Sequence, residues 1–286
     1  MRTDILDLHR FYERPLGQMA ASFIAARIVA QWGDGRGMRV AGFGFTSPYL
    51  EAMPGAERRL NLAPAAQGVI RWPTVNGGAA PAANSASLIS EMRWPLPDAS
   101  IDRLILAHGL EEVGDPARLM REIWRVLSPD GRVIIVAAHR RGLWSAFDTT
   151  PFAAGRPWSR RQLWRLLEEA TFTVVRSTGA LYFPPLHSNI ILSAARSWER
   201  AGARVWPALG GVLLVEATKE LMAPVGKLAT DGVRIQRRAA VRPASSGAAA
   251  GMIDVQCRSD SVAIEAGPPE RYSPRGAPGT FSAPCR

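Results

Sequence analysis

The clearest hydrophobic pattern of the chain lies between residues 94 and 138. Ile101–Ala107 is a short apolar run that predicts a strand. Residues 116–127 then repeat apolar side chains with helical spacing, and Arg132–Ala138 is apolar and β-branched, as in a strand buried on both faces. Strand, helix and strand at this spacing predict a βαβ unit with parallel strands and a right-handed crossover. The predicted inner face of the helix consists of Met120, Ile123, Trp124 and Leu127.

Local signals define the ends of these elements. Asp115 suits the N-cap of the helix, and Pro116 suits its first turn, where a missing N–H costs nothing. Ser128–Gly131 has the composition of a type I turn that closes it. Ser159 and Gln162 form a capping box for a further helix. The core stripe predicted for that helix is Leu163, Leu166, Leu167 and Ala170.

The remaining pattern extends the alternation of strands and helices. Residues 16–32 predict a helix that buries Met19, Phe23, Ala26 and Ala30. Met38–Ala41 predicts a strand, followed by a glycine turn over Gly42–Thr46 and a helix start at Ser47. Further predicted elements are strands at 59–62, 172–175 and 212–217, a helix at 190–201, and a loop at 73–86.

Both periodicities end near residue 225. The last 61 residues contain 7 Gly, 6 Pro and 11 Ala and no Trp, although the whole chain contains nine. Such a composition cannot bury enough apolar surface to offset the entropy of ordering. We therefore expect one α/β domain over residues 1–225 and a disordered tail over 226–286.

Composition changes this picture only a little. The 286 residues are 47% hydrophobic and 21% charged, as in globular proteins. The net charge of +10 includes 9 basic and 5 acidic residues of the tail, so the predicted domain is only mildly basic. Because aromatic residues are not interleaved with the tail arginines, we expect no nucleic-acid partner.

The positions of the cysteines and the hydropathy of the chain indicate in which cellular compartment the protein is expected. Cys257 and Cys285 both lie in the tail, which excludes a disulfide or a thiolate zinc site within the first 225 residues. No segment reaches the roughly 18 to 20 uncharged apolar residues of a membrane span, and the N-terminus does not resemble a secretory signal. We expect a soluble cytoplasmic protein without a bound metal.

Three consecutive segments carry a family resemblance. Trp94–Asp102 reads WPLPDASID, Leu110–Pro116 reads LEEVGDP, and Arg121–Val133 reads REIWRVLSPDGRV. They resemble the LPFPD-x-SFD, LEHV-x-DP and REI-x-RVLKPGG motifs of class I S-adenosylmethionine-dependent methyltransferases, in particular the group called methyltransferase type 11. The resemblance covers roughly residues 38–175, and 211–219 fits the family's antiparallel last strand. It implies a Rossmann-like α/β fold, with a doubly wound, mostly parallel seven-stranded sheet.

The resemblance also implies a site for S-adenosylmethionine. Gly42 and Gly44 match the family's G-x-G turn, where glycine permits a tight turn and a close approach to a ligand. Val40 stands where the family has an acid, and Thr46 stands at the third glycine. Asn61 takes the place of the acid that holds the ribose, and Glu91 is the candidate for the adenine. The implied cofactor-binding residues are Gly42, Phe43, Gly44, Asn61 and Glu91.

Methyl transfer is an in-line displacement, which mainly requires alignment of the reacting atoms and exclusion of water. A general base is needed only for some nucleophiles. His108 follows the strand 101–107 and is the candidate base; the alternative is a loop histidine satisfied by the backbone. We expect a methyltransferase that acts on a small molecule.

Three alternatives stay open. A methyltransferase fold that has lost catalysis and serves as a binding or regulatory protein is suggested by Val40, Thr46 and Asn61. A nucleic-acid-associated module is suggested by the net charge alone. A nicotinamide dehydrogenase is the weakest, because Ser47 stands where its fingerprint requires a third glycine.

Overall fold

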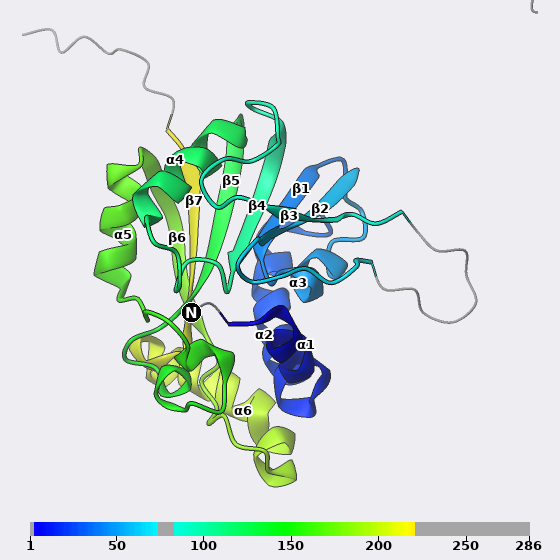
Figure 1. Cartoon of the computed structure of the whole chain (residues 1–286). Helices are drawn as coiled ribbons and strands as arrows, with labels where there is room; N and C mark the ends of the chain where they lie inside the picture. The colour runs from blue at the N-terminus through cyan, green and yellow to red at the C-terminus, as the bar shows by residue number, and fades with distance from the viewer. Residues whose placement is uncertain (1–2, 74–82, 221–286) are drawn as a thin grey trace, which may run out of the picture. The chain divides into compact units, whose positions relative to one another are not determined.

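A computed structural model describes residues 3–73 and 83–220, which form a seven-stranded sheet with helices on both faces (Figure 1). The strand order is β3-β2-β1-β4-β5-β7-β6. Strands β1 to β5 run parallel to one another, and β7 runs antiparallel to both β5 and β6. This is the doubly wound, mostly parallel sheet expected from the resemblance. The strands are β1 Arg39–Gly44, β2 Arg58–Pro64, β3 Ala86–Ile89, β4 Ile101–Ala107, β5 Leu127–Ala138, β6 Phe172–Ala180 and β7 Val212–Lys219.

Successive residues of the central strands enter opposite cores, because side chains alternate between the two faces of a sheet. In β4, Leu104 and Leu106 pack on one side, while Ile105 and Ala107 pack on the other. Strand β5 alternates in the same way and is buried throughout Val133–Ala138. The prediction of a strand buried on both faces is therefore confirmed.

The helices divide between the two faces. One core contains side chains of α1 Ile5–Glu13, α2 Pro15–Trp32, α3 Ser47–Glu51 and α6 Asn189–Val205. The other contains those of α4 Pro116–Val126 and α5 Arg160–Glu169. Figure 1 shows α5 and α1 on opposite sides of the sheet. Short 3-10 turns, η1 Leu143–Ala146, η2 Pro151–Ala153 and η3 Pro207–Leu209, complete the carboxyl edge.

The predicted starts of α4 and α5 are confirmed. The Asp115 carboxylate accepts the N–H of Arg118 at the start of α4. At the start of α5, Ser159 and Gln162 bond each other's backbone N–H groups as a capping box. These caps depend on three or four consecutive residues, so the sequence alone specifies them.

Two sequence predictions were wrong in detail. Helix α2 buries Leu16, Gly17, Ala20, Ile24, Ile28 and Trp32, whereas Ala26 and Ala30 are exposed. It is apolar around most of its circumference, so periodicity does not select its inner stripe. Ser128–Gly131 belongs to β5 rather than to a separate turn: Leu127 pairs with Ile101, and the register shifts before Arg132 pairs with Arg103.

Two elements were not predicted, namely α1 and β3. The sequence carries a signal for α1, since Ile5, Leu8 and Tyr12 have helical spacing and Asp4 caps the first turn. Strand β3 is short and half exposed, and its alternation is too brief to stand out. The predicted disordered tail after residue 225 and most of the predicted loop at 73–86 lie outside the described residues.

Candidate active site

The turn after β1 lies where the strand order changes direction, the usual ligand site of such sheets. Gly44 has φ +91°, and a Cβ there would lie 2.1 Å from the carbonyl oxygen of Ala107 in β4. A Cβ on Gly42 would lie 1.9 Å from Oγ1 of Thr46. Both glycines lie within β1, which extends to Gly44 rather than ending at Ala41 as predicted, and both are required by the packing there, independently of any ligand.

Asn61 joins this turn to β2. The Thr46 hydroxyl donates to Oδ1 of Asn61 at 3.0 Å, and Nδ2 of Asn61 donates to Oγ of Ser47 at 3.1 Å. Thr46 and Asn61 are both buried. Asn61 pairs with Gly42, and β2 continues for three residues to Pro64. The amide thus holds two neighbouring strands and the first turn of α3 in place.

A cavity of about 160 Å³ lies beside Asn61 at the carboxyl ends of β1 and β2. Its walls come from α1, the turn after β1, α3, β2 and the segment 69–72. Cavities that enclose a small-molecule ligand usually measure about 300–1,000 Å³, so this one accommodates only part of a nucleoside-containing cofactor. Its lining includes the side chains of Tyr12, Phe45, Ser47, Asn61 and Trp72.

Tyr12 of α1 covers the glycine turn. Its ring stacks on Phe45 with centroids 5.0 Å apart and an interplanar angle of 15°. Its hydroxyl lies 2.9 Å from the hydroxyl of Tyr49 and 2.8 Å from Nε2 of His108. Burial raises the pKa of both tyrosines, so both phenols stay protonated. Sequence reasoning missed Tyr12 because it missed α1.

His108 follows directly after the carboxyl end of β4, as expected from its position in the sequence. It has φ +50° and is 8% exposed, and its ring lies 4.7 Å from that of Phe152. Burial lowers the pKa of His108 to about 3, because the charged imidazolium is poorly solvated there. The imidazole is therefore neutral near pH 7, and Nε2 bonds the hydroxyl of Tyr12.

This burial makes stability depend on pH. Below the unfolded pKa of about 6.5, the unfolded state binds a proton that folded His108 does not bind until about pH 3. Stability therefore falls as the pH is lowered through this window, with a slope approaching about 1.4 kcal/mol per pH unit. We expect the free energy of unfolding, measured with urea between pH 5 and 6, to change less steeply with pH in His108→Gln than in the wild type. The control His187→Gln, at an exposed position, should show the same pH dependence as the wild type. Equal slopes in all three proteins would contradict this expectation.

Two buried acceptor oxygens near His108 have no hydrogen-bond partner among the described residues. Gln67 donates through Nε2 to the His108 carbonyl at 3.0 Å, but its Oε1 is unpartnered. Glu111 accepts the Ala138 N–H at 3.0 Å through Oε1, and its Oε2 is unpartnered. Burial raises the pKa of Glu111. Unpartnered buried acceptors are costly, so this part of the sheet edge favours a ligand that donates hydrogen bonds.

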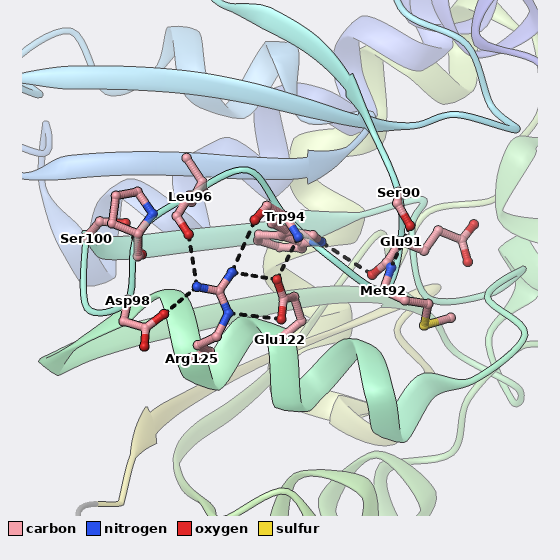
Figure 2. Close-up of polar contacts among 10 residues, drawn as sticks. Ser90, Glu91, Met92, Trp94, Leu96, Asp98, Ser100, Glu122 and Arg125 are labelled. Atoms are coloured by element: carbon pink, nitrogen blue, oxygen red, sulfur yellow. Dashed lines mark hydrogen bonds and ion pairs between the residues drawn. The ribbon is translucent and has the colours of Figure 1, made fainter.

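The structure does not bring all the predicted cofactor residues together. Glu91 lies two residues beyond β3 and does not line the cavity; its carbonyl accepts Nε1 of Trp94 at 3.3 Å. Figure 2 shows the Glu91 carboxylate pointing away from Arg125. Phe43 is fully buried and stacks on Trp94 with centroids 5.0 Å apart. The side chain of Phe43 therefore packs in the core on the α4 side.

Val40, which stands where the family has an acid, lies in an apolar environment. Val40 is 1% exposed and packs in the same core as α2.

Within residues 3–73 and 83–220, no group of three or more His, Cys, Asp or Glu side chains could hold a metal ion. The same residues include no helix long and apolar enough to cross a bilayer.

Sequence comparison places these features in a known context. Residues 42–135, from the glycine turn to β5, match the family model of a methyltransferase domain. Over 121 residues the chain is 33% identical to a probable S-adenosylmethionine-dependent methyltransferase of Mycobacterium tuberculosis. This aligned stretch covers 40% of this chain and 43% of that protein. A stretch of 45 residues is 40% identical to demethylmenaquinone methyltransferase of Deinococcus radiodurans, covering 16% and 19% of the two chains. The chain thus spans less than half the length of these relatives.

Solved structures are similar to this chain over about three quarters of its length. An S-adenosylmethionine-dependent methyltransferase of Thermotoga maritima matches with a TM-score of 0.52 and 14% identity, covering 76% of this chain and 96% of that one. A chain in the complex between the Haloferax volcanii Trm112 methyltransferase activator and its methyltransferase matches with a TM-score of 0.52 and 17% identity, covering 77% and 100%. At these identities the likeness concerns the fold.

Proposed function

We propose that this chain, whose residues 42–135 match a methyltransferase domain, is a class I methyltransferase that transfers a methyl group from S-adenosylmethionine to a small-molecule acceptor. The observation that carries the proposal is the match over residues 42–135 together with the cavity at the carboxyl ends of β1 and β2. Ligands of open α/β sheets collect at this edge.

The residues around the cavity fit the cofactor's chemistry. Tyr12, Phe45 and Trp72 offer apolar and aromatic walls for a flat base, and Asn61 and Ser47 offer polar atoms for ribose hydroxyls. Outside the cavity lining, the unpartnered oxygens of Gln67 and Glu111 near His108 suit an ammonium donor. When bound, S-adenosylmethionine supplies an electrophilic methyl group on a positively charged sulfur.

The chain's own residues would align the acceptor and exclude water. Tyr12, Phe45 and Phe152 form an aromatic wall next to His108, and such a wall keeps the reacting atoms out of bulk water. His108 remains the proposed general base for acceptors that need one, although burial lowers its pKa to about 3 and so makes it a weak base in this conformation. Because its Nε2 bonds the Tyr12 hydroxyl, this role requires Tyr12 to withdraw when the substrates bind. That withdrawal would also enlarge the cavity.

Asn61 provides a sharp test of cofactor binding. A carboxylate accepts hydrogen bonds about 1 kcal/mol more strongly than an amide, and Thr46 and Ser47 can both donate to an aspartate at this position. We expect Asn61→Asp to tighten adenosylhomocysteine binding by about fivefold in calorimetry. The control Asn189→Asp adds the same charge on the exposed start of α6 and should leave the affinity unchanged.

The same titration decides between the proposal and its rival. The neutral residues Val40, Thr46 and Asn61 and the small cavity favour a methyltransferase fold that serves as a binding or regulatory protein. If neither the wild type nor Asn61→Asp binds adenosylmethionine or adenosylhomocysteine at up to about 1 mM, the rival holds and the methyl-transfer proposal fails.

A further inference from the structure

Helix α6 and the following turn η3 expose an unusual set of large apolar side chains. Ile190 is 81% exposed, Val205 58%, Trp206 54%, Leu209 50% and Trp198 46%. Single exposed apolar residues need no explanation, but a contiguous group on one element marks an interaction surface. Figure 1 shows α6 at the same end of the domain as α1 and the turns that follow β5.

The helix has three distinct faces. Ala195, Glu199 and Gly202 are buried against the domain. Ile190, Ala194, Trp198 and Val205 follow one another at spacings of four or seven residues and form an apolar row. Arg196, Arg200 and Arg204 follow at spacings of four and form a basic row, and all three are exposed. Both rows lie outside the buried face, and we call them together the α6 face.

The α6 face carries positive charge without compensation. The only acidic residue of α6 is Glu199, which turns inward and is 4% exposed. Its carboxylate accepts the N–H of Tyr182 at 2.8 Å and lies 3.6 Å from the guanidinium of Arg27. Among the described residues, the arginines of the basic row form no ion pair.

We propose that the α6 face binds the surface of a bilayer that contains anionic lipids, with the helix lying in the plane of the interface. Helices that lie on membranes combine an apolar face with Arg or Lys, and tryptophan prefers the headgroup region. The apolar row enters the interface, and the basic row meets the anionic headgroups. A second copy of the chain fits the face less well, because a two-fold dimer would bring uncompensated arginines together.

Binding to vesicles tests this proposal on the full chain. We expect cosedimentation with phosphatidylcholine vesicles that contain phosphatidylglycerol, and at least tenfold weaker binding to phosphatidylcholine alone. Each arginine near an anionic surface contributes about fivefold, so Arg196→Gln, Arg200→Gln and Arg204→Gln together should weaken binding about a hundredfold. Trp198→Ser with Ile190→Ser should weaken it at least tenfold and reduce quenching of tryptophan emission by brominated lipids.

Matched variants on the opposite face of the sheet serve as controls. Arg118→Gln, Arg121→Gln and Arg165→Gln remove the same charge from α4 and α5, and Trp164→Ser removes a partly exposed tryptophan. These variants should bind vesicles within about twofold of the wild type.

Three results would overturn the proposal. The first is vesicle binding that all α6 variants retain, which would mean attachment through another segment. The second is an equal loss in the controls, which would indicate a general effect of charge. The third is absence of vesicle binding together with a dimer that Trp198→Ser dissociates, which would assign the α6 face to a second copy. None of these readouts depends on methyl transfer.

Discussion

Replacing Gly44 by alanine is expected to destabilise the domain by about 4 kcal/mol. The new Cβ would lie 2.1 Å from the Ala107 carbonyl oxygen, at a residue whose φ of +91° disfavours any side chain. That carbonyl also accepts the N–H of Phe45 at 2.9 Å. Relief of this clash therefore requires β1 and β4 to separate at the end of their pairing. The expected loss is a large fraction of a typical domain stability of about 5–15 kcal/mol.

Gly114→Ala is the matched control for this experiment. Nothing lies within 4 Å of a Cβ on Gly114, and its φ is not in the left-handed region. Chemical denaturation should place Gly114→Ala within about 1 kcal/mol of the wild type. Stabilities of Gly44→Ala and Gly114→Ala that agree within that margin would show that the turn yields more easily than its geometry implies. If Gly44→Ala does lose stability, its loss of ligand binding is no evidence for a ligand contact at Gly44.

The second large effect is expected at Arg125, which organises the loop after β3 (Figure 2). Its guanidinium donates to both carboxylate oxygens of Glu122, at 2.6 and 3.1 Å, and to the carbonyls of Trp94 and Leu96, at 3.2 and 2.9 Å. It also pairs with Asp98. Burial alone would raise the pKa of Glu122, but the hydrogen bonds from Arg125 and from the Trp94 N–H, together with the charge of Arg125, more than offset this, so the net shift is downward.

Arg125→Gln is expected to lower the free energy of unfolding by about 3 kcal/mol, because it leaves Glu122 without its counter-charge and frees two backbone carbonyls. Arg125→Lys should recover only part of the loss, since an ammonium cannot reproduce the planar fork. Arg121 on the same helix is exposed, so Arg121→Gln should stay within about 0.5 kcal/mol of the wild type in urea unfolding. Equal effects at positions 121 and 125 would contradict the assigned role.

The Arg125 network explains why the motifs predicted the fold better than the cofactor site. The WPLPD segment and the REI-x-RVL helix resemble the family because they hold each other: the Trp94 N–H donates to Glu122 at 2.6 Å, and Arg125 binds the carbonyls of the loop. These contacts are structural and say nothing about a ligand. The positions where the family contacts its cofactor are the ones at which this chain differs, at Val40, Thr46 and Asn61.

The candidate site was predictable only in part. The sequence located the glycines of β1, Asn61 and His108, and all lie at the carboxyl edge of the sheet, although only Asn61 of the predicted site residues lines the cavity. Tyr12 and Gln67 contact His108 from 96 and 41 residues away, and no local pattern connects residues at such separations. The depressed pKa of His108 follows from burial by these distant segments and was not accessible from its neighbours in the chain.

By itself, the sequence determined the features that depend on neighbouring residues. These are the caps of α4 and α5, the alternation of β4 and β5 between two cores, and, through three motifs, the parallel sheet with its antiparallel last strand. The tertiary structure decided which face of α2 is buried, that Tyr12 covers the glycine turn, and that the α6 face stays unburied. Caps and strand alternation follow from local backbone geometry, whereas burial is set by which distant segments reach the same place.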